Sequence, residues 1–121
     1  MELKAEARLL RVFLGEGDQA KHAPLYEAIV REARAAGLAG ATAWRGVMGF
    51  GPTSRIRTAK VLDLSADLPV VVEITDEEEK IRAFLPVLKR LFETSGCGGL
   101  VTMEKVEVIH YLHGGADRPA D

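Results

Sequence analysis

Hydrophobic residues follow strand-like and helix-like spacings in turn along the chain. Leu25, Ile29 and Ala33 recur at helical spacing, and Gly37 is a suitable residue to end that helix. The run Val70-Val71-Val72 does not alternate with polar residues, which favours a strand covered on both faces. In chain order we predict a strand at 8–14, a helix at 24–36, strands at 41–48 and 68–74, a helix between a capping box at 75–78 and a glycine-rich break at 94–99, and a strand at 105–112.

This order of elements predicts an α+β fold of the ferredoxin-like βαββαβ plan, an antiparallel four-stranded sheet with two helices on one face. In that plan the first and third strands are central, and these two segments are the most apolar strands of the chain. The helices cover only one sheet face, yet both strands carry apolar residues for two faces, so we expect a homo-oligomer. We expect one domain at 1–112 and a disordered tail at 113–121.

Composition and charge exclude several classes of protein. The chain has 121 residues, with 16 basic and 18 acidic side chains and a formal net charge of −2, which argues against non-specific nucleic-acid binding. The single cysteine, Cys97, excludes an internal disulfide framework and fits a reducing compartment. Because no apolar run has the length of a signal peptide or membrane span, we expect a cytoplasmic protein without direct membrane insertion.

Glycines and basic residues are concentrated after the second predicted strand. The stretch 38–51, LAGATAWRGVMGFG, contains Gly46, Gly49 and Gly51, and the connection that follows contains Arg55, Arg57 and Lys60. Backbone N–H groups and basic side chains of this kind can bind an anion together. The alternatives are that the glycines only form a bulge and a tight turn, and that the basic residues form a solvated face.

Several motifs resemble the DUF190 (UPF0166) family over residues 7–112. They are PLYEAIV at 24–30, GLAGAT at 37–42, Arg45-Gly46, Gly49-Phe50-Gly51, DLPVVVE at 67–73, EKI at 79–81 and VEVI at 106–109. That family is similar in fold to the PII signal-transduction proteins, which are trimers that bind adenine nucleotides in clefts between subunits. The resemblance therefore implies a trimer and, as a candidate effector, an adenine nucleotide. It also implies an accessory role beside fluoride-channel proteins.

Two short segments resemble the ligand loops of PII proteins. Gly49-Phe50-Gly51 is similar to the start of the T-loop, which contacts target proteins, and Gly96-Cys97-Gly98 is similar to the phosphate-binding B-loop. The resemblance is incomplete, because Gly96-Cys97-Gly98-Gly99 stands where PII proteins have Gly-Asp-Gly-Lys, and Pro52-Thr53 replace an Arg-Gln pair that serves a magnesium site. Read from the residues alone, the glycines at 96–99 can equally be a plain linker between a helix and a strand. The candidate ligand-binding residues are Arg45, Gly46, Gly49, Gly51, Arg55, Arg57, Lys60, Gly96, Gly98 and Gly99.

The leading functional hypothesis is a PII-like regulatory protein. It would bind an adenine nucleotide or related phosphorylated effector at subunit clefts and control a protein target through the loop at about 49–67. The alternative is an accessory interaction module for a membrane transporter or channel, without ligand sensing. We expect no enzymatic activity and no metal site, because the chain shows no catalytic triad order, no paired-carboxylate motif and no metal-ligand spacing among its histidines.

Overall fold

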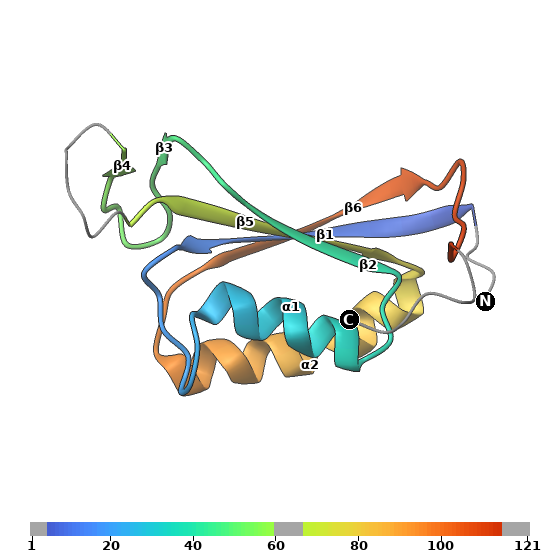
Figure 1. The fold of residues 1–121 in the computed structure, drawn as a ribbon, viewed down its shortest axis with the longest axis horizontal. Helices are drawn as coiled ribbons and strands as arrows, with labels where there is room; N and C mark the ends of the chain where they lie inside the picture. The colour runs from blue at the N-terminus through green and yellow to red at the C-terminus, as the bar shows by residue number, and fades with distance from the viewer. Residues whose placement is uncertain (1–4, 60–66, 115–121) are drawn as a thin grey trace.

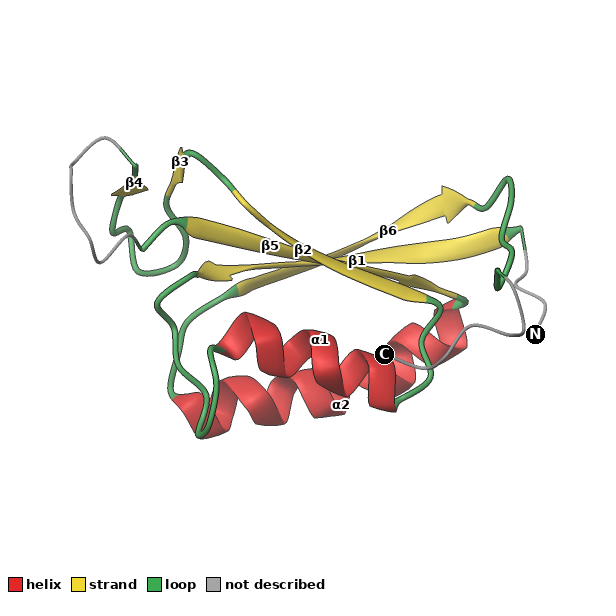
Figure 2. Cartoon of the chain, in the orientation of Figure 1, coloured by secondary structure: helices red, strands yellow, loops and turns green. Residues whose placement is uncertain are grey.

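The fold is a four-stranded antiparallel sheet with two helices against one face. The computed structural model describes residues 5–59 and 67–114. The large sheet has the strand order β2-β5-β1-β6, and β3 and β4 form a separate two-stranded sheet at one end of it (Figure 1). Both helices lie on the same face (Figure 2), so the ferredoxin-like prediction is confirmed. The elements are β1 (Glu6–Gly15), α1 (Leu25–Ala35), β2 (Gly40–Arg45), β3 (Met48–Gly49), β4 (Arg57–Thr58), β5 (Pro69–Asp76), α2 (Glu78–Ser95) and β6 (Leu100–Glu107).

The core lies between the sheet and the two helices. Alternate residues of β1, among them Leu10 and Val12, point toward the helices and are fully buried. They meet Ile29 of α1 and Phe84 of α2, which belong to the same cluster of buried residues. The prediction that the first and third large strands are central is confirmed, because β1 pairs with both β5 and β6, and β5 pairs with both β1 and β2.

The second and the last predicted strands differ most from the sequence-based prediction. The second strand, expected at 41–48, ends at Arg45, and Met48–Gly49 form a different strand that pairs with β4. The last strand, expected at 105–112, lies at Leu100–Glu107 because its register with β1 runs from Phe13 back to Glu6, the first residue of β1. Residues 108–114 then have no regular structure, and the remainder of the predicted tail, 115–121, lies outside the described residues.

The predicted capping box at 75–78 is wrong. Thr75 is still part of β5, and Glu77 is the N-cap residue without a capping side-chain hydrogen bond. Asp76 takes a related part instead: its fully buried carboxylate accepts hydrogen bonds from the backbone N–H of Glu77 at 2.6 Å and of Ala39 at 2.9 Å. One side chain thus connects the end of β5 with the start of α2 and with the connection between α1 and β2.

The sheet face opposite the helices carries an apolar row beside an ionic row. Trp44, Val71, Phe13 and Leu100 lie across the four strands in register, and Trp44 and Leu100 are about half exposed. Next to them, Arg11 forms ion pairs with Glu73 at 2.9 Å and with Glu104. The hydrogen bond from Arg11 holds the pKa of the Glu73 carboxyl below its usual value. The expectation of apolar residues for two faces therefore holds for one row of this face, and the next row in register is polar, with Arg11 and Glu73 on the central strands and threonines on the edge strands.

Among residues 5–59 and 67–114, the helices lack the combination of length and hydropathy that crossing a bilayer requires.

Candidate functional site

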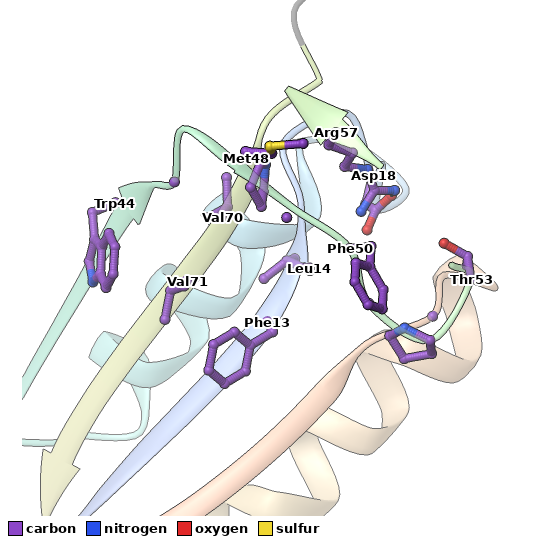
Figure 3. A pocket seen from close by; sticks show the side chains of 16 residues that line it. Phe13, Leu14, Asp18, Trp44, Met48, Phe50, Thr53, Arg57, Val70 and Val71 are labelled. Carbon is purple, nitrogen blue, oxygen red and sulfur yellow. The ribbon is translucent and has the colours of Figure 1, made fainter. Parts of the chain in front are cut away.

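A cavity of about 350 Å³ lies at the end of the sheet where β1 ends and β5 begins. The segment from Gly46 to Thr53 forms one wall, and Gly98, just before β6, adds to another. Figure 3 shows Arg57 and Asp18 beside one another at one end and Trp44 at the opposite side. Aromatic and aliphatic side chains cover most of the remaining surface: Phe13, Leu14, Met48, Phe50, Pro69, Val70 and Val71.

Glycines shape the wall between β2 and β3. The Gly46 N–H donates to the carbonyl oxygen of Pro69 at 2.7 Å, which extends the contact between β2 and β5 by one residue beyond the Arg45–Val70 pair. A Cβ at position 46 would lie 3.2 Å from Cγ of Pro69, so a larger residue would have to push the proline aside. Met48 and Gly49 then pair with Thr58 and Arg57, which closes the segment between them into a loop. Close packing against Pro69 therefore explains the glycine at position 46, whereas a Cβ at Gly49 would make only ordinary contact with Pro69 and one at Gly51 would meet no atom within 4 Å.

Arg57 is the basic side chain at the end of the cavity. Its side chain is only 13% exposed; Nε donates to Oδ2 of Asp67 at 3.1 Å and Nη2 donates to Oδ1 of Asp18 at 3.4 Å. Both carboxylates also accept backbone hydrogen bonds: Asp18 from Gly15 at 2.9 Å and Asp67 from Gly17 at 2.7 Å. We call Asp18, Arg57 and Asp67 the Arg57 triad. It attaches β4 to the connection between β1 and α1.

The structure brings half of the sequence-predicted site residues together. Those that line the cavity are Gly46, Gly49, Gly51, Arg57 and Gly98. Arg45 and Arg55 do not line it; they are about two-thirds exposed and pair with Glu16 at 3.6 Å and Asp67 at 3.4 Å. Lys60 lies outside the described residues.

Gly96 and Gly99 lie next to the cavity without lining it. Gly96 ends α2 in the left-handed conformation with φ of 70°, and its N–H donates to the carbonyl oxygen of Phe92 at 2.9 Å. A Cβ at Gly99 would overlap the ring of Phe92 and would lie 3.2 Å from the carbonyl oxygen of Phe13. Helix ending and packing therefore explain these two glycines.

Changing Gly99 to alanine is expected to lower the free energy of unfolding by about 1–3 kcal/mol, because the new methyl group overpacks the contact with Phe92. Urea unfolding measures this loss, with Gly40→Ala as the control, since a Cβ at position 40 meets no atom within 4 Å. Equal stability of the two variants would show that position 99 has room for a side chain.

Several lining residues were not among the sequence-predicted set. Asp18, Phe13 and Trp44 all line the cavity. The turn at 15–18 ends β1 and does contain an acidic residue, but Asp18 and Arg57 are 39 positions apart. No local spacing links them, and only the pairing of the strands brings them together.

Chemically, the cavity suits a flat, partly apolar molecule with an anionic group. Its aromatic walls can pack against a ring system, and Arg57 can donate to an oxyanion. A larger and more open groove lies between α2 and β6, but of the predicted residues it contains only Gly98 and Gly99. Across the two described stretches, no three His, Cys, Asp or Glu side chains gather where they could hold a metal ion.

Comparisons with solved structures agree with this geometry at the level of the fold. The chain is similar to CPII, a nitrogen regulatory PII-like protein of Thiomonas intermedia K12, in its structure bound to ADP, AMP and bicarbonate. The two superpose with a TM-score of 0.65 at 17% identity, over 85% of this chain and 88% of CPII. A putative PII-like signaling protein from Thermus thermophilus gives a TM-score of 0.62 at 19% identity, over 90% of this chain and 94% of its own.

Sequence relatives share a larger part of their residues with the chain. A UPF0166 protein of Aquifex aeolicus (strain VF5) is 44% identical over 103 residues, which cover 85% of this chain and 93% of the relative. A UPF0166 protein of Methanocaldococcus jannaschii is 32% identical over 91 residues, 75% of this chain and 83% of the relative. The model of the DUF190 family, described as "Uncharacterized ACR", matches residues 7–108. The chain therefore belongs to the DUF190 (UPF0166) family, as its sequence motifs indicated, and it has a PII-like fold.

Proposed function

We propose that this protein is a PII-like regulatory protein that binds an adenine nucleotide, or a related phosphorylated effector, in the cavity beside Arg57. The observation that carries the proposal is the cavity itself, where aromatic side chains and one arginine line the same space of about 350 Å³. A PII-like protein of the same fold binds ADP and AMP, which supports an adenine nucleotide as the first ligand to test.

The loop between β3 and β4 supplies the proposed output. Phe50 and Ile56 on this loop, and Val47 just before β3, are each more than half exposed, and Phe50 also lines the cavity. An effector that contacts Phe50 differently in two loop arrangements would shift their populations and so change the surface offered to a target protein. The proposal includes no catalytic step.

A homo-oligomer, with a trimer as the specific expectation, belongs to the same proposal. The apolar row on the open sheet face contains Phe13, Trp44 and Val71, which also line the cavity. A neighbouring subunit packed on this row would close the cavity from that side. Light scattering tests the assembly, and a stable monomer at working concentration would contradict the intersubunit cleft.

Calorimetric titration with AMP, ADP, ATP and cyclic AMP, each with and without magnesium, tests the ligand. We expect at least one to bind with Kd below about 1 mM. Gly51→Val should abolish that binding, because a Cβ at position 51 meets no atom within 4 Å and the side chain can enter the space that Gly51 lines. Gly40→Val is the matched control, since position 40 is equally open and lies outside the cavity.

If no adenine nucleotide bound under any of these conditions, the sensor function would be wrong. The second candidate function would then remain, an interaction module for a membrane transporter or channel that works without a ligand. Three exposed apolar side chains within one short segment, Val47, Phe50 and Ile56, favour it, because exposed apolar surface is often a site of protein contacts.

A further inference from the structure

The Arg57 triad presents a mixed charge to the cavity. It contains one guanidinium and two carboxylates, and of its members only Arg57 and Asp18 line the cavity. An anionic group that approaches Arg57 therefore also meets the carboxylate of Asp18. The negative charges of the ligand and of Asp18 repel each other, and solvent ions screen this repulsion poorly in a partly buried site.

The two carboxylates hold Arg57 unequally. Asp67 contacts Nε at 3.1 Å, accepts the Gly17 N–H at 2.7 Å and also pairs with Arg55 at 3.4 Å. Asp18 contacts Nη2 at the longer distance of 3.4 Å. Hydrogen bonds weaken with distance, so the Asp18 contact is the weaker of the two and is the one that faces the cavity.

We propose that Asp18 competes internally with the anionic group of the ligand. Its carboxylate occupies the side of the Arg57 guanidinium that a phosphate group would take, while Asp67 keeps Arg57 and β4 in place. Asp18 thereby lowers the affinity for phosphate-bearing ligands and determines how strongly the cavity prefers a nucleotide over its nucleoside. This inference rests on the proposed function, because it assigns the role of the phosphate in the same cavity.

Asp18→Asn isolates the charge of this residue. The amide keeps the size of the side chain and an oxygen that can accept the Gly15 N–H, a hydrogen bond of 2.9 Å in the present structure. We expect AMP to bind at least threefold more tightly to this variant, whereas the affinity for adenosine stays within twofold. NMR titration follows both ligands into the millimolar range, and Asp18→Ser serves as a second neutral variant if Asp18→Asn does not fold.

Two arginine variants provide the matched controls. Both Arg55 and Arg57 pair with Asp67, but only Arg57 is buried and lines the cavity. Arg57→Gln should reduce the affinity for AMP to that for adenosine, and Arg55→Gln should leave the ratio of the two affinities unchanged. A decrease in the ratio for Arg55→Gln as large as the increase for Asp18→Asn would show only a general charge effect and would overturn the inference.

Inorganic phosphate separates failure of this inference from failure of the proposed function. If AMP binds the wild type and Asp18→Asn does not raise its affinity relative to adenosine, Asp18 is not a competitor, although the proposed function stands. If the wild type binds no adenine nucleotide but Asp18→Asn gains binding of inorganic phosphate, the nucleotide is wrong and the role of Asp18 stands. If neither probe binds either protein, both proposals are wrong.

Discussion

Replacing Asp76 by alanine is expected to lower the free energy of unfolding by about 2–4 kcal/mol, because the two backbone N–H groups of Ala39 and Glu77 lose their acceptor. The carboxylate is fully buried, so water cannot simply take its place. Both the start of α2 and the entry to β2 depend on this side chain. Urea unfolding followed by circular dichroism measures the loss.

Two further variants serve for comparison with Asp76→Ala, one conservative substitution and one control at an exposed position. Asp76→Asn keeps one acceptor oxygen and places an NH₂ group near the other N–H, so its loss should be smaller than that of alanine. Glu93→Ala removes an exposed carboxylate on α2 and should change stability by less than about 0.5 kcal/mol. A loss for Asp76→Ala as small as that for Glu93→Ala would contradict the role assigned to the two hydrogen bonds.

Gly15→Ala is expected to displace the Arg57 guanidinium from the Arg57 triad. A Cβ at position 15 would overlap the terminal atoms of Arg57, and Nη2 would lie 2.7 Å away. Because these atoms are the far end of a flexible side chain, the chain should still fold while Arg57 moves out. Two part-buried carboxylates then lose their cation, and we expect a loss of about 1–3 kcal/mol in the free energy of unfolding.

A double-mutant cycle shows whether this loss passes through Arg57. In the Arg57→Gln background the methyl group at position 15 has no guanidinium to displace, so Gly15→Ala should cost much less there. Gly40→Ala serves as the control for alanine substitution at an open glycine of a strand. Equal costs of Gly15→Ala in both backgrounds would mean that the substitution acts on the backbone of β1 instead.

The local sequence predicted some of the residues that line the cavity and gave no indication of others. Gly46, Gly49, Gly51 and Arg57 stand within one short stretch whose composition was unusual, and all four line the cavity. Arg45 and Arg55 have the same chemistry and are close in sequence, yet they face solvent. Composition identifies a segment that can bind an anion, but which side chains turn inward depends on strand pairing.

The sequence by itself determined the order of elements and the central position of β1 and β5. Unbroken apolar runs such as Val70–Val72 must be covered on both faces, and apolar residues at helical spacing must face one core, so these patterns admit few arrangements. The tertiary structure decided what depends on register between distant segments. The pairing register with β1 placed β6 at Leu100–Glu107, and the pairing of strands brought Asp18 to Arg57 across 39 positions. Such contacts have no local signal, because the residues meet only when the sheet has formed.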